Sequence, residues 1–207
     1  MKPAVFPTVV LALAAMLCLT RPAAAQPPTA RERESAVAEL ESSRKALLAA
    51  VARLSPAQWN YKSSPDRWSP AECVEHIALA EDGYFDLIGK LLKAPPNPEK
   101  KPEAAGKDAR VLEIMSDRTS TRVAPDSLQP ARRWSDPRDA IAHFNLGRDR
   151  LIAFVRTTHD DLRSHIQAHR ATGPIDAYQW VLLASGHSRR HTAQIEEVKA
   201  HPGFPGK

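Results

Sequence analysis

The sequence predicts an all-α protein, a four-helix bundle with a long crossover between its second and third helices. Four segments repeat apolar residues at helical spacing, and a stretch rich in Pro and Lys separates the first two from the last two. No segment alternates convincingly with a period of two, so we expect no strands. The 207 residues suffice for one domain, and 43% apolar and 26% charged residues exclude both wholesale disorder and a multispan membrane protein.

Residues 1–25 have the pattern of a secretory signal peptide. Lys2 precedes an uninterrupted apolar run over residues 9–19, and three alanines before Gln26 form a small-residue cleavage site. The run is shorter than the ~20 residues that span a bilayer. The sequence therefore predicts an exported protein, periplasmic or secreted, whose mature domain is residues 26–207 and which has no membrane association after cleavage.

The charge balance of the mature chain limits its partners. Residues 1–25 hold two of the 29 basic residues and none of the 24 acidic ones, so the mature chain carries a net charge of only +3. No run of Lys and Arg is interleaved with aromatic residues, as in many nucleic-acid-binding surfaces. We expect no nucleic-acid partner.

The first two helices are each expected to begin at a capping box, in which a Ser or Thr and a Glu three residues later satisfy the free backbone N–H groups. The two boxes are Thr29–Glu32 and Ser69–Glu72. The first helix is predicted over residues 31–54, where Ser55 and Pro56 end it. The second is predicted over residues 69–92, with Pro70 at its first helical position.

Residues 93–135 are expected to form a linker or insertion inside the bundle domain. Four prolines and four lysines fall within residues 93–107, a composition typical of solvated chain without a face to bury. Residues 108–117 can hold one short helix. The third bundle helix is then predicted over residues 136–157 and the fourth over residues 176–200.

Histidines occupy two of the stripes that should face the apolar interior. His187 and His191 lie one turn apart in the fourth stripe, and His76 lies at the edge of the apolar face of the second helix. Two imidazoles at i and i+4 can reach one ion, and a third from a facing helix leaves an open position, as in catalytic zinc sites. We therefore predict a divalent-metal site at these three residues, the alternative being neutral core histidines. His165 and His169 have the same spacing but lie off any apolar stripe, and we interpret them as solvated.

Two arginines, two glutamates and a cysteine also lie on or beside the apolar faces of the predicted helices. Arg44 and Arg148 lie inside apolar stripes, so each needs an acidic partner, a route to solvent or an anionic ligand. An ion pair is the simpler interpretation, whereas two arginines pointing toward a metal would favour an anionic substrate. Glu72 and Glu81 flank the His76 face and are candidate general bases, unless they are solvated flank residues. Cys73 is expected to be a small core residue rather than a ligand or a reactive thiol.

With these residues in view, the chain resembles the DinB-like superfamily of metal-dependent enzymes. The matching stretches, at residues 54–81 and 173–199, are LSPAQWNYKSSPDRWSPAECVEHIALAE and GPIDAYQWVLLASGHSRRHTAQIEEVK. The resemblance implies a four-helix bundle, often a homodimer, with a divalent metal, zinc or nickel, on His76, His187 and His191. Characterised relatives include thiol-dependent transferases and isomerases and suspected hydrolases. Export favours hydrolysis, because low-molecular-weight thiol cofactors are cytosolic.

The first functional hypothesis is therefore a metal-dependent hydrolase or transferase that activates water at the three-histidine site and acts on a small molecule. The alternative is a non-catalytic periplasmic bundle that binds metal or responds to stress. A third interpretation is a bundle whose histidines bind no metal.

Overall fold

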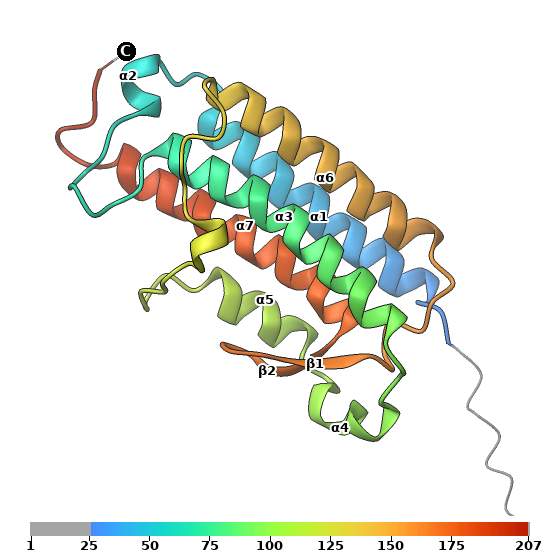
Figure 1. Cartoon of the computed structure of the whole chain (residues 1–207). Helices are drawn as coiled ribbons and strands as arrows, with labels where there is room; N and C mark the ends of the chain where they lie inside the picture. Colours follow the sequence, from blue (N-terminus) through green and yellow to red (C-terminus); the bar gives the residue numbers. More distant parts are fainter. Residues whose placement is uncertain (1–25, 207) are drawn as a thin grey trace, which may run out of the picture.

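A computed structural model describes residues 26–206 of the chain, and the predicted signal peptide lies outside these described residues. Four long helices form a bundle (Figure 1). They are α1 (Ala30–Val51), α3 (Pro70–Lys93), α6 (Pro137–Thr157) and α7 (Ala177–Lys199). The structure confirms the predicted four-helix bundle, and each end of each helix lies within three residues of its predicted place. In the described part of the chain, no helix has the length and apolar character that a membrane span needs.

The directions of the helices explain the long crossover. α1 packs beside α6 and α7, and α3 packs beside the same two helices. Figure 1 shows that α3 and α6 run in one direction and α1 and α7 in the other. Because α3 and α6 are parallel, the chain must return along the whole bundle between them, and residues 94–136 make this return.

Local sequence sets the helix starts. The boxes Thr29–Glu32 and Ser69–Glu72 both form, and a third box, Asp176–Gln179, opens α7. Ser55 and Pro56 do more than end the first helix, because they also open the one-turn helix α2 (Pro56–Trp59) with its own capping box. α2 was not predicted from the sequence.

The interior consists of two apolar clusters with a polar layer between them. Arg148 of α6 is fully buried in this layer, and its Nε and Nη2 donate to the two carboxylate oxygens of Glu81 on α3 at 2.6 and 2.9 Å. Its remaining N–H groups donate to Leu40 O and Ser43 Oγ of α1 and to Ser188 Oγ of α7. All five guanidinium N–H groups thus have acceptors. One side chain connects the four helices of the bundle.

The segment after α6 contains a short β-hairpin, so the expectation of no strands was wrong there, although the chain is otherwise helical as predicted. β1 (Ile166–His169) pairs antiparallel with β2 (Gly173–Asp176), in the register Ile166 opposite Asp176. Each strand has four residues, too few for an alternating pattern to stand out in the sequence. His165 is only 8% exposed, so its interpretation as a solvated residue was also wrong.

The crossover is folded onto the bundle rather than solvated throughout. It contains two 3-10 turns, η1 (Pro98–Lys100) and η2 (Asp126–Leu128), and two helices, α4 (Lys101–Ala104) and α5 (Asp108–Ser116). The prediction of an unpacked stretch over residues 93–107 was wrong at Asn97 and Ala104. The Asn97 side chain bonds both the N–H and the C=O of Ile166, and Ala104 is buried with its carbonyl accepting from Gln179 Nε2. α5 lies where one short helix was predicted and packs against α7.

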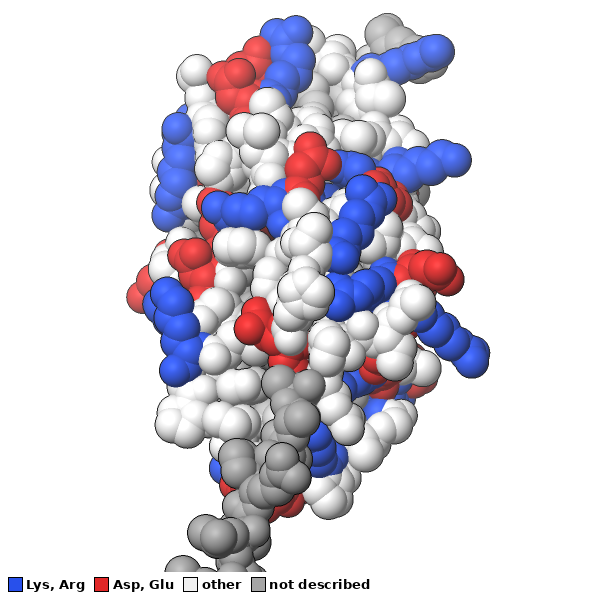
Figure 2. All heavy atoms as spheres, turned by 90° about the vertical axis from the view of Figure 1, so that its right-hand side faces the viewer, with Lys and Arg blue, Asp and Glu red and all other residues white. Residues whose placement is uncertain are grey.

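Charges are mixed on the face of the molecule shown in Figure 2. Lys and Arg side chains lie there with Asp and Glu side chains between them. The absence of a nucleic-acid partner stays a prediction.

Candidate metal centre

The three histidines predicted as metal ligands meet between α3 and α7. One ring nitrogen from each of His76, His187 and His191 lies within 4.8 Å of the other two, and all three residues are buried. The Nε2 atoms of His76 and His187 are 3.0 Å apart. Helical spacing explains the pairing on α7, since residues four apart share one face.

Hydrogen bonds fix which nitrogen of two histidines is free to bind an ion. His76 Nδ1 lies 2.8 Å from Leu128 O, and a carbonyl oxygen only accepts, so Nδ1 carries the proton and Nε2 presents a lone pair. His191 Nδ1 lies 3.0 Å from Gln194 Oε1, which also accepts from Arg118 Nη1, so His191 likewise presents Nε2. Hydrogen bonds of this kind to the outer nitrogen commonly orient metal-ligating imidazoles.

Burial keeps the three rings neutral. It lowers the pKa of His76 below its ordinary value and lowers the pKa values of His187 and His191 well below theirs. The neighbouring rings and Arg190 lower the pKa of His187 further. A metal ion needs neutral imidazoles, so the charge state, the donor atoms and their convergence all fit a divalent ion. The three histidines can hold such an ion, and three nitrogens leave at least one coordination position open.

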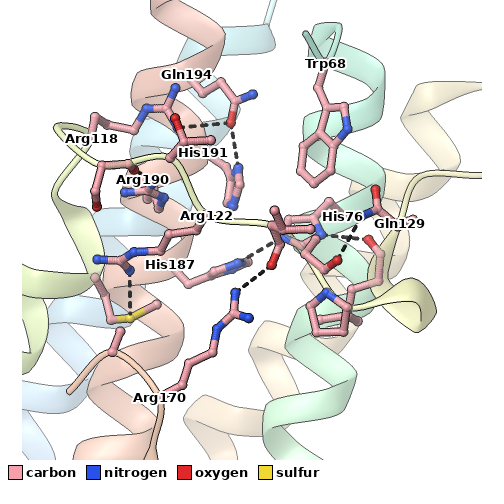
Figure 3. Close-up of a pocket in the computed structure, with 18 of the residues that line it drawn as sticks. Trp68, His76, Arg118, Arg122, Gln129, Arg170, His187, Arg190, His191 and Gln194 are labelled. Atoms are coloured by element: carbon pink, nitrogen blue, oxygen red, sulfur yellow. Dashed lines mark hydrogen bonds between the residues drawn. The ribbon is translucent and has the colours of Figure 1, made fainter. Parts of the chain in front are cut away.

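The histidines lie in the wall of a cavity of about 810 Å³ between α3, α7 and the crossover (Figure 3). Aromatic rings surround them on the cavity side. The Trp68 ring stacks at 5.7 Å from the His191 ring, and the Tyr84 ring meets the His187 ring edge-on at 5.5 Å. Burial raises the pKa of the Tyr84 hydroxyl, and Tyr84 lines the cavity. Tyr84 therefore presents a neutral O–H group to the cavity.

The crossover builds the opposite wall and is held in place by Glu75, the residue before His76. The Glu75 carboxylate accepts hydrogen bonds from the backbone N–H groups of three consecutive residues, Ala131, Arg132 and Arg133. Arg132 has a φ of 58°, a left-handed conformation that helps these N–H groups converge on one carboxylate. These bonds lower the pKa of Glu75 against the opposing effect of burial. The crossover segment that supplies Leu128 O is thereby fixed to the helix that carries His76.

Arginine is the commonest charged residue in the cavity wall, and none of these arginines was predicted from the sequence to belong to a site. The five lining arginines are Arg67, Arg118, Arg122, Arg170 and Arg190. Arg118 forms two bonds to Glu197, at 3.0 and 2.7 Å. Burial, followed by the charges of Arg122 and Arg118, lowers the pKa of Arg190 to about 10. The position of Arg190 directly before His191 was the one sequence signal that could have placed Arg190 at the site.

The four charged residues proposed from the sequence as substrate-binding or catalytic groups do not line the cavity. Arg148 and Glu81 bond each other in the polar layer of the core, and Arg44 pairs with Glu41 and Asp149. The ion-pair interpretation therefore holds for both arginines. Glu72 caps α3 and pairs with Lys62, so it has a structural partner as well.

The structure also bears on the interpretations of Cys73 and His169 that were made from the sequence. Cys73 is fully buried in the apolar core, and desolvation raises the pKa of its thiol, which confirms a core role over a reactive one. His169 is half-buried and lines the cavity beside Trp180, with ring centroids 5.3 Å apart, so it is only partly solvated. Burial lowers the pKa of His169 to about 4, and the ring is neutral at pH 7.

The fold and this cavity define a class of protein, the four-helix bundles whose inward histidines can hold a metal ion. A model of the DinB superfamily matches residues 39–195, which is more than half of the chain. The chain belongs to the DinB superfamily, as its resemblance implied.

Two similar proteins from Bacillus subtilis are consistent with this assignment. The uncharacterized protein YuaE of strain 168 is 24% identical over 148 residues, which are 70% of this chain and 86% of that protein. A solved structure, YfiT, is described as a probable metal-dependent hydrolase with an unusual four-helix bundle topology. It has a TM-score of 0.54 and 18% identity to this chain, and the match covers 89% of this chain and 94% of YfiT. The likeness to YfiT supports the bundle fold.

Proposed function

We propose that this protein is a metal-dependent hydrolase of small molecules, in which His76, His187 and His191 hold a divalent zinc or nickel ion. The observation that carries the proposal is the convergence of three neutral imidazoles, within 4.8 Å of one another, on one side of a cavity of about 810 Å³. The description of YfiT as a probable metal-dependent hydrolase adds support from a protein of the same fold. A cavity large enough for a small molecule favours an enzyme over a protein that only sequesters metal.

A bound divalent ion would lower the pKa of a coordinated water toward ~7 and so supply hydroxide at neutral pH. The protein's own groups would prepare this chemistry. Leu128 O and Gln194 Oε1 hold His76 and His191 with their Nε2 atoms free. Trp68 stacks on the ring of His191 and would help to hold it in place. The Tyr84 O–H group is placed to donate a hydrogen bond to an oxygen of a substrate in the cavity.

A hydrolysis screen tests the proposal. The mature chain, loaded in parallel with zinc and with nickel, is assayed against carboxylic esters, lactones, amides and phosphomonoesters, beside its His187→Ala variant. We expect turnover of at least one class by the wild-type chain and its loss in the variant. Equal turnover by the two proteins would contradict the proposal, because the reaction would then not need the site. Turnover of none of the four classes by a fully loaded chain would favour the non-catalytic metal-binding alternative.

We also propose that the protein acts outside the cytoplasm, on the basis of the signal-like pattern of residues 1–25. N-terminal sequencing of the protein recovered from its native compartment should begin at Gln26. A start at Met1 would contradict export by this route. The homodimer implied by the resemblance stays a prediction, which light scattering of the purified chain would check.

A further inference from the structure

Arg190 has a guanidinium nitrogen without a partner. The residue is only 3% exposed and lines the cavity, and its Nη2 donates to Ser120 O at 2.6 Å. Its Nη1 is buried and makes no hydrogen bond within the described part of the chain. A buried charged donor is costly to leave unpaired, and such groups normally have a partner. The free Nη1 of Arg190 therefore indicates a missing acceptor in the cavity.

Two other arginines of the wall also lack an acidic partner among residues 26–206. Arg122 donates through Nη2 to Ile114 O and through Nη1 to the Met115 sulfur. Arg170 donates through Nη2 to Val123 O. These bonds hold the guanidinium groups in place but neutralise none of their charge. Figure 3 shows Arg122 and Arg190 next to His187.

The carboxylates of the wall do not balance this charge. Asp66 and Glu197 are the two that line the cavity, and Arg118 already binds Glu197 with two hydrogen bonds. The histidines add no negative charge, and a divalent ion on them would make the cavity still more positive. A cavity with this excess of positive charge favours an anionic occupant.

We propose that Arg190 and Arg122, with Arg170 at the rim of the cavity, bind a carboxylate or phosphate group of the substrate beside the three-histidine site. A guanidinium group presents planar N–H donors that match the oxygens of both anions. The backbone carbonyls that accept from Nη2 of each arginine fix its orientation before the anion arrives. The statement that the bound anion is part of a substrate rests on the proposed hydrolase function. The binding of an anion by these arginines does not depend on that function.

The test is calorimetric titration of the metal-loaded mature chain with two probes, inorganic phosphate and succinate. Arg122→Gln removes one partly buried guanidinium, and Arg190→Lys keeps the charge but removes the planar donors. Arg138→Gln is the matched control, because Arg138 is exposed and pairs with Asp136 outside the cavity. Metal content is measured on every protein, and titration of His187→Ala shows whether an anion bound by the metal alone accounts for the signal.

We expect at least one probe to bind the wild-type chain and the control alike, and each cavity variant to weaken that binding about tenfold or more. Tighter binding of phosphate would identify a phosphorylated substrate, and tighter binding of succinate a carboxylated one. No binding of either probe to a metal-loaded chain would overturn the inference and leave the hydrolase proposal standing. Binding that survives both cavity substitutions but disappears in His187→Ala would also overturn it. Binding that depends on the arginines in a chain that holds no metal would support the inference and contradict the proposed function.

Discussion

His76 on α3 and His187 on α7 face each other with their Nε2 atoms 3.0 Å apart. Leu128 O keeps the proton of His76 on its other ring nitrogen, so the His76 Nε2 atom presents a lone pair toward His187. The close approach of the two Nε2 atoms is favourable if His187 Nε2 carries a proton and donates it to His76 Nε2. It is also favourable if both nitrogens bind one cation. A metal ion and a proton therefore compete for the same pair of nitrogens.

Gln194 should set metal affinity without being a ligand. Its Oε1 accepts from His191 Nδ1 and orients the ring. Replacing Gln194 with Ala should weaken zinc binding by about 10- to 100-fold, the usual effect of losing such a partner. Competition with a chromogenic chelator measures the affinity. Gln167→Ala, an exposed change on β1, is the control and should bind zinc as the wild type does. Equal affinities for all three proteins would contradict the assigned role.

The metal-free protein should lose stability as the pH falls below about 6.5, the ordinary pKa of an unfolded histidine. The folded-state pKa values of His76, His187 and His191 are lowered, and that of His169 is lowered to about 4. Between the folded and unfolded pKa values the unfolded chain binds more protons, so stability rises with pH in this window. Each such histidine contributes up to about 1.4 kcal/mol per pH unit there.

Urea unfolding at pH 7.5, 6.5 and 5.5 measures this dependence. His187→Gln should show a shallower decline than the wild type, because one lowered pKa is gone. A wild-type midpoint that does not change between pH 7.5 and 5.5 would contradict the buried neutral state of these rings.

The Arg148–Glu81 pair should be essential to stability, because each charge is buried and satisfied by the other. Arg148→Met leaves Glu81 buried without its partner and should lower the free energy of unfolding by about 3–5 kcal/mol. Replacing both, as Arg148→Met with Glu81→Leu, should restore much of this loss. Arg150→Met is the control, since Arg150 pairs with Asp82 on the surface of the same two helices and should cost about 1 kcal/mol or less. Equal losses for Arg148→Met and Arg150→Met would contradict this account.

Gly186 permits the close packing of α5 on α7. A Cβ built there lies 2.8 Å from Met115 Cβ and 3.3 Å from Leu112 O. Gly186→Ala should therefore displace α5 and cost about 1–3 kcal/mol of stability. Gly89→Ala on α3 meets nothing within 4 Å and should instead be neutral or stabilising by up to about 1 kcal/mol. Thermal unfolding compares the two variants, and the opposite order would contradict the packing.

The predictable parts of this protein are those that local spacing determines. The capping boxes at Thr29 and Ser69 and the apolar stripes located the helices, and the pairing of His187 with His191 follows from helical periodicity. The partner of Arg148 could not be predicted, because Glu81 lies 67 residues away and the contact depends on how α3 and α6 pack.

The crossover was harder to predict, because its order comes from distant contacts. Glu75 binds the backbone of residues 131–133, and Leu128 O meets His76 across 52 residues. Neither contact leaves a periodic signal in the sequence. For the same reason the cavity arginines supplied by the crossover, Arg118 and Arg122, were not assigned, and Arg44 and Arg148 were considered in their place.

The central claim is that three histidines hold one metal ion, and elemental analysis tests it most directly. Residues 26–207 are purified without a chelator or a histidine tag, beside the His187→Ala variant, and both are reconstituted with zinc and with nickel at neutral pH. The account predicts about one metal ion per wild-type chain and loss of that ion in the variant. A wild-type chain that holds no metal after reconstitution, or a variant that retains it fully, would contradict the account.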